Sequence, residues 1–256
     1  MKILIASGGT KAAIDTVRDV TNKSKGRFGA EIAKLCVEAG HDVTFLRADG
    51  SESPFVWKSD QTKDHNWSAE LQAFADHYNW CQRYRARFEE VRFEQYGDYV
   101  RKVEMIVPDM DAVVLAAAVS DYSPKYKYGK ISTLGPLTVE MSPNTKVISR
   151  VRGWNPKPEL FLVGFKMLVG ASFEPLILAA TMSIRQNKCD MVVANDYETL
   201  HLSDHKTLII EPDQPEPGQK AWECKHHKSS IYTKDKRAAA VVDRLNQHAQ
   251  RISQTR

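Results

Sequence analysis

Short apolar runs recur along the chain, and small or polar residues follow each of them. The runs cover residues 2–6, 43–46, 112–119, 160–164 and 191–194. A continuous apolar run, unlike an alternating one, is typical of a strand that is buried on both faces of a parallel sheet. The carboxyl ends of such strands meet at one edge of the sheet, where open α/β folds bind their ligands. The pattern therefore predicts a ligand crevice at that edge.

Segments with helical spacing lie between these runs. Apolar residues recur three or four positions apart over residues 28–39, 69–87, 96–107 and 173–187. This spacing places them on one face of a helix, which can then pack against the sheet. Strands that alternate with helices predict an α/β fold with a doubly wound, mostly parallel, Rossmann-like sheet.

The pattern changes towards the end of the chain. Leu208–Ile210 and a run around Ala221–Lys225 flank the turn-rich segment Glu211–Gly218, and they predict an antiparallel pair of strands. The last helix is expected to be capped by Thr233. Three residues are expected on its apolar face: Ala239, Val242 and Leu245.

A single domain over residues 1–256 is expected, with a helical insertion at about residues 50–105 and a small antiparallel extension at about residues 200–232. Within the insertion, aromatic and apolar residues keep helical spacing. This stripe predicts packing in the core rather than a cofactor site. Its members are Leu71, Phe74, Tyr78, Cys81 and Phe88.

One connection is unusually long. About twenty residues, from Ser7 to Arg27, separate the first strand from the first helix. Loops of this length inside a compact unit are usually functional or disordered. Because the loop begins at the carboxyl end of a strand, it is expected to lie in the ligand crevice.

Composition narrows the classes of protein to consider. Of the 256 residues, 42% are hydrophobic and 27% are charged, which is an ordinary globular balance. The net charge of +4 is small and the basic residues are dispersed, which argues against nucleic-acid binding. No apolar run approaches the roughly 18 residues of a membrane span. Met1 leads directly into a strand, so no signal peptide is expected and a cytoplasmic protein is predicted.

The cysteines and histidines offer no framework of their own. The four cysteines are too dispersed for a set of disulfides, and Cys36 and Cys189 lie among apolar residues as core positions would. His226 and His227 are adjacent on a predicted strand, so their side chains would point to opposite faces and would not share a metal ion. The metal ligands, if any, stay unknown.

Two candidate sites lie in the long loop. Gly8, Gly9 and Thr10 form a backbone that a phosphate group can approach closely, although a plain tight turn would need the same glycines. Farther along, four cations fall within ten residues and are mixed with Asn22 and Ser24. These cations are Arg18, Lys23, Lys25 and Arg27. They fit either a solvated basic loop or a phosphate site at the amino end of the next helix.

Two further candidates follow the third apolar run. Small residues around Ala118 leave room above the sheet, and Asp121 could hold a ribose hydroxyl or a metal ion, or simply form a turn. Lys130 lies between Gly129 and Gly135, as in a mobile flap that closes over a triphosphate, although a surface lysine would look the same.

These motifs, in this order, resemble those of the phosphopantothenoylcysteine synthetase family, in its monofunctional type. The family opens with a strand, then GGT and a D-x-V-R-x-x-[ST]-N-x-S-x-G-x-x-G segment, which here are Ser7–Thr10 and Asp15–Gly29. The family segments AAAVxDY, GFK and VAND match Ala116–Tyr122, Gly164–Lys166 and Val193–Asp196. The resemblance is collinear over nearly the whole chain.

The resemblance implies a phosphopantothenate–cysteine ligase of coenzyme A biosynthesis, acting as a homodimer. Its substrates would be 4′-phosphopantothenate and cysteine, with CTP or ATP as co-substrate and Mg²⁺, and the reaction would pass through an acyl nucleotidylate. It implies catalytic roles for Asn22, Arg18 and Lys130. It implies nucleotide-binding roles for Gly8, Gly9, Thr10, Ser24, Ala118, Asp121, Phe165 and Lys166.

One departure from the family leaves alternatives open. Where many members have a lysine-rich KxKK flap, this chain reads Lys130-Ile131-Ser132-Thr133. A non-catalytic nucleotide-binding paralogue would fit that change. An NAD(P)-dependent Rossmann oxidoreductase is a second alternative, although the chain lacks its close-set glycine fingerprint.

Overall fold

The chain folds around one mixed sheet, as the apolar runs predict. The computed structural model describes residues 1–59, 66–213 and 219–255. Its central sheet has eight strands in the order β12-β11-β10-β9-β6-β1-β4-β5. Six of these strands are mutually parallel. They are β1 (Lys2–Ser7), β4 (Asp42–Ala48), β5 (Phe88–Phe93), β6 (Ala112–Leu115), β9 (Phe161–Leu168) and β10 (Met191–Asp196). The predicted fold class is confirmed.

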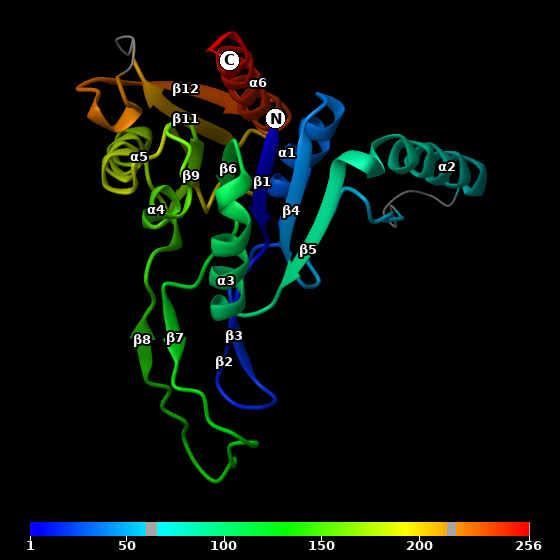
Figure 1. The fold of residues 1–256 in the computed structure, drawn as a ribbon. Coiled ribbons are helices and arrows are strands. Elements are labelled where there is room, and N and C mark those ends of the chain that lie inside the picture. Colours follow the sequence, from blue (N-terminus) through cyan, green and yellow to red (C-terminus); the bar gives the residue numbers. More distant parts are fainter. Residues whose placement is uncertain (60–65, 214–218, 256) are drawn as a thin grey trace.

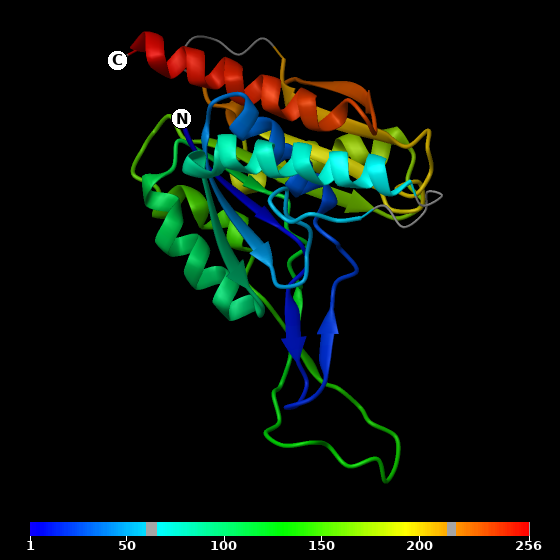
Figure 2. The ribbon, with the colours of Figure 1, turned by 90° about the vertical axis from the view of Figure 1, so that its right-hand side faces the viewer.

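Helices cover both faces of the sheet, which is why the central strands β1, β6 and β10 consist almost entirely of buried residues. In β1, Ile3 and Ile5 face one core cluster while Leu4 and Ala6 face the other. One face is covered by α1 (Arg27–Glu38) and α6 (Arg237–Thr255). The opposite face is covered by α3 (Tyr96–Ile106), α4 (Val151–Trp154) and α5 (Phe173–Asn187), as Figures 1 and 2 show.

The strand order reverses next to β1. From β1 the chain proceeds to β4 and β5 on one side, and then returns to β6, β9 and β10 on the other. The switch point therefore lies between β1 and β6, where the connections leave the sheet in opposite directions. A crevice at the carboxyl ends of these two strands is the expected ligand site of such a fold.

Two pairs of short strands extend beyond this carboxyl edge. The predicted long loop contains a hairpin of β2 (Lys11–Ala13) and β3 (Asp19–Thr21), and β7 (Tyr122–Pro124) pairs with β8 (Met141–Pro143) beside it. Together with the connecting residues 125–140 they form an arm that projects from the sheet (Figures 1 and 2). The arm is thus built from the segments that follow β1 and β6.

The antiparallel extension is present, but the residues predicted for its second strand were wrong. β11 (Lys206–Pro212) pairs with β12 (His227–Thr233), whereas Ala221–Glu223 is a 3₁₀ turn. Ala221 and Cys224 are buried, so their apolar character reflects packing of the turn. β12 is an edge strand in which no residue is buried and most are polar, and such a strand leaves no apolar run to detect. Residues 214–218 of the predicted turn lie outside the described residues.

The last helix begins later than predicted. Because β12 continues to Thr233, α6 begins at Arg237. Val242 and Leu245 are buried as expected, but Ala239 is exposed. The remaining short helical turns are η1 (Arg85–Arg87), η2 (Val107–Asp109), η3 (Val147–Ser149) and η4 (Ala221–Glu223).

The insertion forms the predicted helix but not the predicted core. In α2 (Trp67–Tyr84), described in full, no residue is buried. The side of the helix that carries Leu71, Phe74 and Tyr78 leaves these residues 69%, 45% and 54% exposed. The helix touches the body through residues such as Trp80, which donates to Glu38. The prediction that the stripe packs in the core was wrong, because helical spacing says nothing about what a helix packs against.

Candidate functional site

Glycines let the first loop fold closely against the end of β1. Gly8 has φ of +90°, and a Cβ atom there would come within 2.6 Å of the Ala48 Cβ. A Cβ on Gly29 would come within 2.3 Å of the Ser7 Oγ. The same hydroxyl donates to the Gly26 carbonyl oxygen over 2.9 Å. The glycines that were predicted to admit a phosphate are therefore needed first for the packing of the loop on itself.

The segments after β1 and β6 continue to pair beyond the sheet. The Ala118 amide donates to the Gly8 carbonyl oxygen (2.7 Å), and the Thr10 amide donates to the Ala118 carbonyl oxygen (3.1 Å). The buried Thr10 hydroxyl accepts from the Ser120 amide over 2.9 Å. Gly8, Thr10 and Ala118, which are far apart in sequence, thus lie together at the switch point.

Asn22 joins this pairing from the returning half of the loop. Its side-chain amide donates to the Ala118 carbonyl oxygen over 2.7 Å. A Cβ on Gly9 would come within 2.9 Å of the Asn22 carbonyl oxygen, so Gly9 allows Asn22 to approach. The half-buried Asn22 thus lies against Gly9 and is hydrogen-bonded through its side chain to Ala118.

The amino end of α1 opens into the same place. Its N-cap is Gly26, in a left-handed conformation with φ of +76°, and no described side chain caps it. The first turn contains no acidic residue. Its amide groups therefore keep their capacity to bind an anion, and the helix dipole adds to it. Ser24, which is exposed, lies next to this end and accepts from the Gly26 amide over 3.4 Å.

Two of the four predicted cations form ion pairs with acidic side chains of the protein. Arg18 pairs with Asp15 over 2.9 Å, and Arg27 pairs with Glu52 over 2.9 Å. Lys23 and Lys25 are exposed beside the helix end. The loop is therefore a structured element rather than a uniformly solvated basic segment, with Lys23, Lys25 and the ion-paired Arg27 exposed to solvent.

Asp15 and Arg18 also hold the predicted flap. The buried carboxylate of Asp15 accepts from the Ile131 amide over 3.0 Å, and the Arg18 guanidinium donates to the Ile131 carbonyl oxygen over 3.3 Å. The hydrogen bond from Ile131 lowers the pKa of Asp15 below its ordinary value. Lys130 is exposed and precedes Ile131 directly. Arg18 thus contacts the arm at the residue next to Lys130.

The side chains of the GFK segment do not lie on one face of the sheet. Phe165 lies on the α1 side of the sheet, where its ring meets Phe28 edge-on at 5.6 Å. Lys166, the next residue of β9, points to the opposite face, because side chains alternate along a strand. Asp121 is exposed, and its backbone carbonyl accepts from the Asn144 amide over 2.8 Å. No hydrogen bond between described residues links Asp121 or Lys166 to the glycine loop, which consists of Gly8, Gly9 and Thr10.

Sequence reasoning missed a buried polar cluster at the end of β10. The Asn195 Oδ1 accepts from the Thr207 hydroxyl over 2.7 Å and lies 3.0 Å from the His205 Nε2. The His205 Nδ1 lies 2.8 Å from the Thr199 hydroxyl. His205 is 1% exposed, and burial lowers its pKa, so it is neutral at pH 7. The sequence signals were a polar residue ending an apolar run and the VAND segment that contains Asn195, and neither indicated the contacts with His205 and Thr207.

The arrangement can bind an anionic ligand and present amide donors to it. It combines the amino end of α1, the positively charged side chains of the loop and arm, and the Asn22 amide. Among residues 1–59, 66–213 and 219–255, no group of three or more His, Cys, Asp or Glu side chains is placed to hold a metal ion. No helix in the described part of the chain is long and apolar enough to cross a membrane.

Comparisons with known proteins point to one family. The sequence model of the DNA/pantothenate metabolism flavoprotein C-terminal domain matches residues 1–60 and 81–247. The unmatched interval falls in the α2 region. The coenzyme A biosynthesis bifunctional protein CoaBC of Thermococcus kodakarensis is 32% identical over 213 residues, which are 83% of this chain and 45% of that protein. The phosphopantothenate–cysteine ligase of Mus musculus is 29% identical over 232 residues, which cover 77% of this chain and 73% of that protein.

A solved structure has the same fold. The DNA/pantothenate metabolism flavoprotein of Streptococcus pneumoniae matches with a TM-score of 0.72 at 22% identity, covering 97% of this chain and 99% of that one. The chain spans less than half the length of the bifunctional relatives that it matches.

Proposed function

This chain belongs to the family of the DNA/pantothenate metabolism flavoprotein C-terminal domain, and from that membership we propose that it is a phosphopantothenate–cysteine ligase. It would join the carboxylate of 4′-phosphopantothenate to the amine of cysteine in coenzyme A biosynthesis. The names of its relatives support this reaction. The observation that carries the proposal is the contact of Asn22 with Ala118 beside the uncapped amino end of α1.

The nucleotide would lie across the switch point. Its phosphates would approach Gly8, Gly9 and the first amides of α1, with Ser24 as a further donor and Lys130 closing from the arm. The base would lie on the α1 side of the sheet near Phe165. Support comes from the backbone donors at the amino end of α1, which suit the fixed geometry of phosphate oxygens.

The chemistry would proceed in two steps. The carboxylate of phosphopantothenate attacks the α-phosphate of the nucleotide, which forms an acyl nucleotidylate and releases pyrophosphate. The amine of cysteine then attacks the acyl carbon, and the nucleoside monophosphate leaves as the amide bond forms. Each step develops negative charge on oxygen, which fixed N–H donors and cations stabilise more than water does. Arg18 and Asn22 would supply these groups.

Mg²⁺ would be held mainly by the nucleotide. The described residues lack a set of three acidic or histidine side chains for it, and Mg²⁺ usually binds through one or two carboxylates plus substrate phosphates. Asp121, exposed at the base of the arm, could provide one carboxylate. The ion would neutralise phosphate charge during the first step.

The proposal includes a homodimer that acts in the cytoplasm. The projecting arm supports the dimer, because the β2–β3 hairpin and residues 125–140, which contain Arg18 and Lys130, extend away from the body of the subunit, where a second copy could meet them (Figure 2).

Pyrophosphate release tests the proposal and decides the nucleotide. The protein is mixed with 4′-phosphopantothenate, Mg²⁺ and either CTP or ATP, with and without cysteine. We expect release that needs phosphopantothenate, and formation of phosphopantothenoylcysteine only when cysteine is present. If neither nucleotide supports pyrophosphate release, the chain is not a ligase and the non-catalytic reading takes its place.

A further inference from the structure

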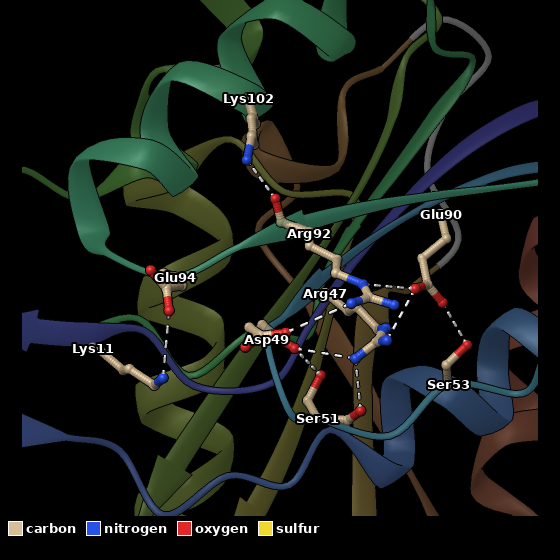
Figure 3. A network of polar contacts seen from close by, with 10 residues as sticks. Lys11, Arg47, Asp49, Ser51, Ser53, Glu90, Arg92, Glu94 and Lys102 are labelled. Atoms are coloured by element: carbon tan, nitrogen blue, oxygen red, sulfur yellow. Dashed lines mark hydrogen bonds and ion pairs between the residues drawn. The ribbon is translucent and has the colours of Figure 1, made fainter. Parts of the chain in front are cut away.

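A buried arginine lies behind the glycine loop. Arg47, near the end of β4, is 5% exposed. Its guanidinium pairs with the Glu90 carboxylate over 2.9 Å and donates to the Ser51 carbonyl oxygen over 2.9 Å. Figure 3 shows both contacts at the centre of a polar network that also contains Ser53 and Arg92. No motif in the sequence assigned a role to Arg47, which directly follows the apolar run at residues 43–46.

The network fixes both halves of the turn at residues 48–53. Arg47 holds the carbonyl group of Ser51, and Glu90 accepts from the Ser53 hydroxyl over 2.8 Å. Within the turn, the Ser51 amide and hydroxyl both donate to the Ala48 carbonyl oxygen, over 3.0 Å and 2.7 Å. The turn therefore has little freedom to move while Arg47 and Glu90 are in place.

This turn is one wall of the glycine loop. A Cβ atom on Gly8 would come within 2.6 Å of the Ala48 Cβ and 2.8 Å of the Ser51 Cβ. On its other side, Gly8 lies against Gly26, whose Cβ would come within 3.1 Å of the Gly8 nitrogen. The Glu52 amide also donates to the Lys25 carbonyl oxygen over 2.9 Å. Displacement of the turn would therefore move Gly8 and the approach to α1 together.

A contribution to folding stability alone does not explain why an arginine is buried at this position. Burying an ion pair costs desolvation that its Coulomb attraction repays only when every donor finds a partner. The Arg47 Nε is buried and finds no hydrogen-bond partner among the described residues. What an arginine supplies here is geometry, because one nitrogen of its planar fork meets the Glu90 carboxylate while the other meets the Ser51 carbonyl oxygen, whereas a lysine would have to make both contacts from a single nitrogen.

We infer that Arg47 is a positioning residue of the nucleotide site, which holds the 48–53 turn against Gly8 and so sets the backbone that receives the phosphates. This inference rests on the proposed function. It concerns a residue that touches neither substrate nor nucleotide and acts through Ser51.

The test compares Arg47→Lys with Arg152→Lys. Arg152 is a matched control, because it also joins a carboxylate, Asp190 (2.5 Å), to backbone carbonyls, those of Leu160 and Lys188. Its partners Leu160 and Asp190 precede β9 and β10, so it lies at the amino edge of the sheet, away from the switch point. Both variants keep the positive charge and are expected to lose similar thermal stability.

The kinetic readout is the nucleotide KM compared with the cysteine KM, both measured well below the melting temperature. Arg47→Lys is expected to raise the nucleotide KM about tenfold, leaving the cysteine KM unchanged, whereas Arg152→Lys leaves both unchanged. An unchanged nucleotide KM in Arg47→Lys, or an equal rise in both variants, would overturn the inference.

Amide hydrogen exchange of the free protein keeps the test independent of activity. In Arg47→Lys, peptides covering residues 2–10 and 48–53 are expected to exchange faster, while in Arg152→Lys they exchange as in the wild type. If the wild type proves inactive, the proposed function fails and this exchange pattern still decides the role of Arg47. Faster exchange confined to residues 48–53, with residues 2–10 unaffected, would reduce Arg47 to a local contact and overturn the inference.

Discussion

The side-chain amide of Asn22 donates a hydrogen bond to the carbonyl oxygen of Ala118 over 2.7 Å, and so connects the loop after β1 to the segment after β6. These two segments flank the switch point of the sheet. An amide at this place can face an acyl group bound in the crevice while its own position is fixed by the protein.

Asn22→Asp should separate the two chemical steps. The carboxylate cannot donate to the Ala118 carbonyl oxygen, and its negative charge opposes the charge that develops as cysteine attacks. Pyrophosphate is therefore expected to appear in a burst of about one equivalent per site, with overall turnover reduced at least about a hundredfold. Quench-flow measurement of both products checks this. Unchanged turnover would remove Asn22 from the reaction.

Asp15→Asn should loosen the flap without unfolding the protein. Asp15 accepts from the Ile131 amide and pairs with Arg18, and an asparagine keeps the size but not the charge. The Lys130–Ile131 peptide bond is then expected to be cut by trypsin several-fold faster at pH 8. Asp19→Asn, on an exposed residue of the same hairpin, is the control. Equal cleavage rates in the two variants would mean that Asp15 does not hold the flap.

The parallel sheet and its crevice could be predicted from sequence because they depend on local signals. Each buried strand is a continuous apolar run, and Gly8 and Asn22 fall in a motif whose spacing is specific. The contact of Asn22 with Ala118 joins residues 96 positions apart, and only the order of the motifs suggested it.

The misses share a physical reason. Arg47 and His205 are polar residues whose importance comes from their burial, and sequence spacing carries no record of burial. Conversely, α2 has the spacing of a core helix, yet Leu71 is 69% exposed. Periodicity identifies the apolar side of a helix, but what covers that side is decided by tertiary structure.

Gly8→Ala should cost far more stability than Gly40→Ala. Both glycines have positive φ, +90° and +86°. Among the described residues no atom lies within 4 Å of a Cβ on Gly40, so only backbone strain of about 1 kcal/mol is expected there. At Gly8 the overlap with Ala48 adds overpacking, for a total of about 3 kcal/mol. Urea unfolding measures both, and equal losses would contradict the close packing at Gly8.

His205 should make stability depend on pH. Burial lowers its pKa in the folded protein below the value of about 6.5 expected when unfolded, and the charges of Arg237 and Lys234 add to the effect. Between the two pKa values, the unfolded chain therefore binds a proton at His205 that the folded chain does not bind. The stabilisation is fully present above pH 6.5 and is lost as the pH falls through that value towards the lower folded pKa.

His205→Gln removes this titration and should flatten the curve of unfolding free energy against pH. Each such histidine contributes at most about 1.4 kcal/mol per pH unit to the slope of unfolding free energy. Two other histidines, the buried His41 and the half-buried His248, also have a lowered pKa, so part of the slope should persist in the variant. Urea unfolding between pH 5 and 8 measures it, with His226→Gln, on an exposed histidine, as control. If the His205→Gln curve ran parallel to that of the wild type, His205 would be protonated equally in both states. Below about pH 6.5 the hydrogen bond to Asn195 would then have to be donated by a charged imidazolium.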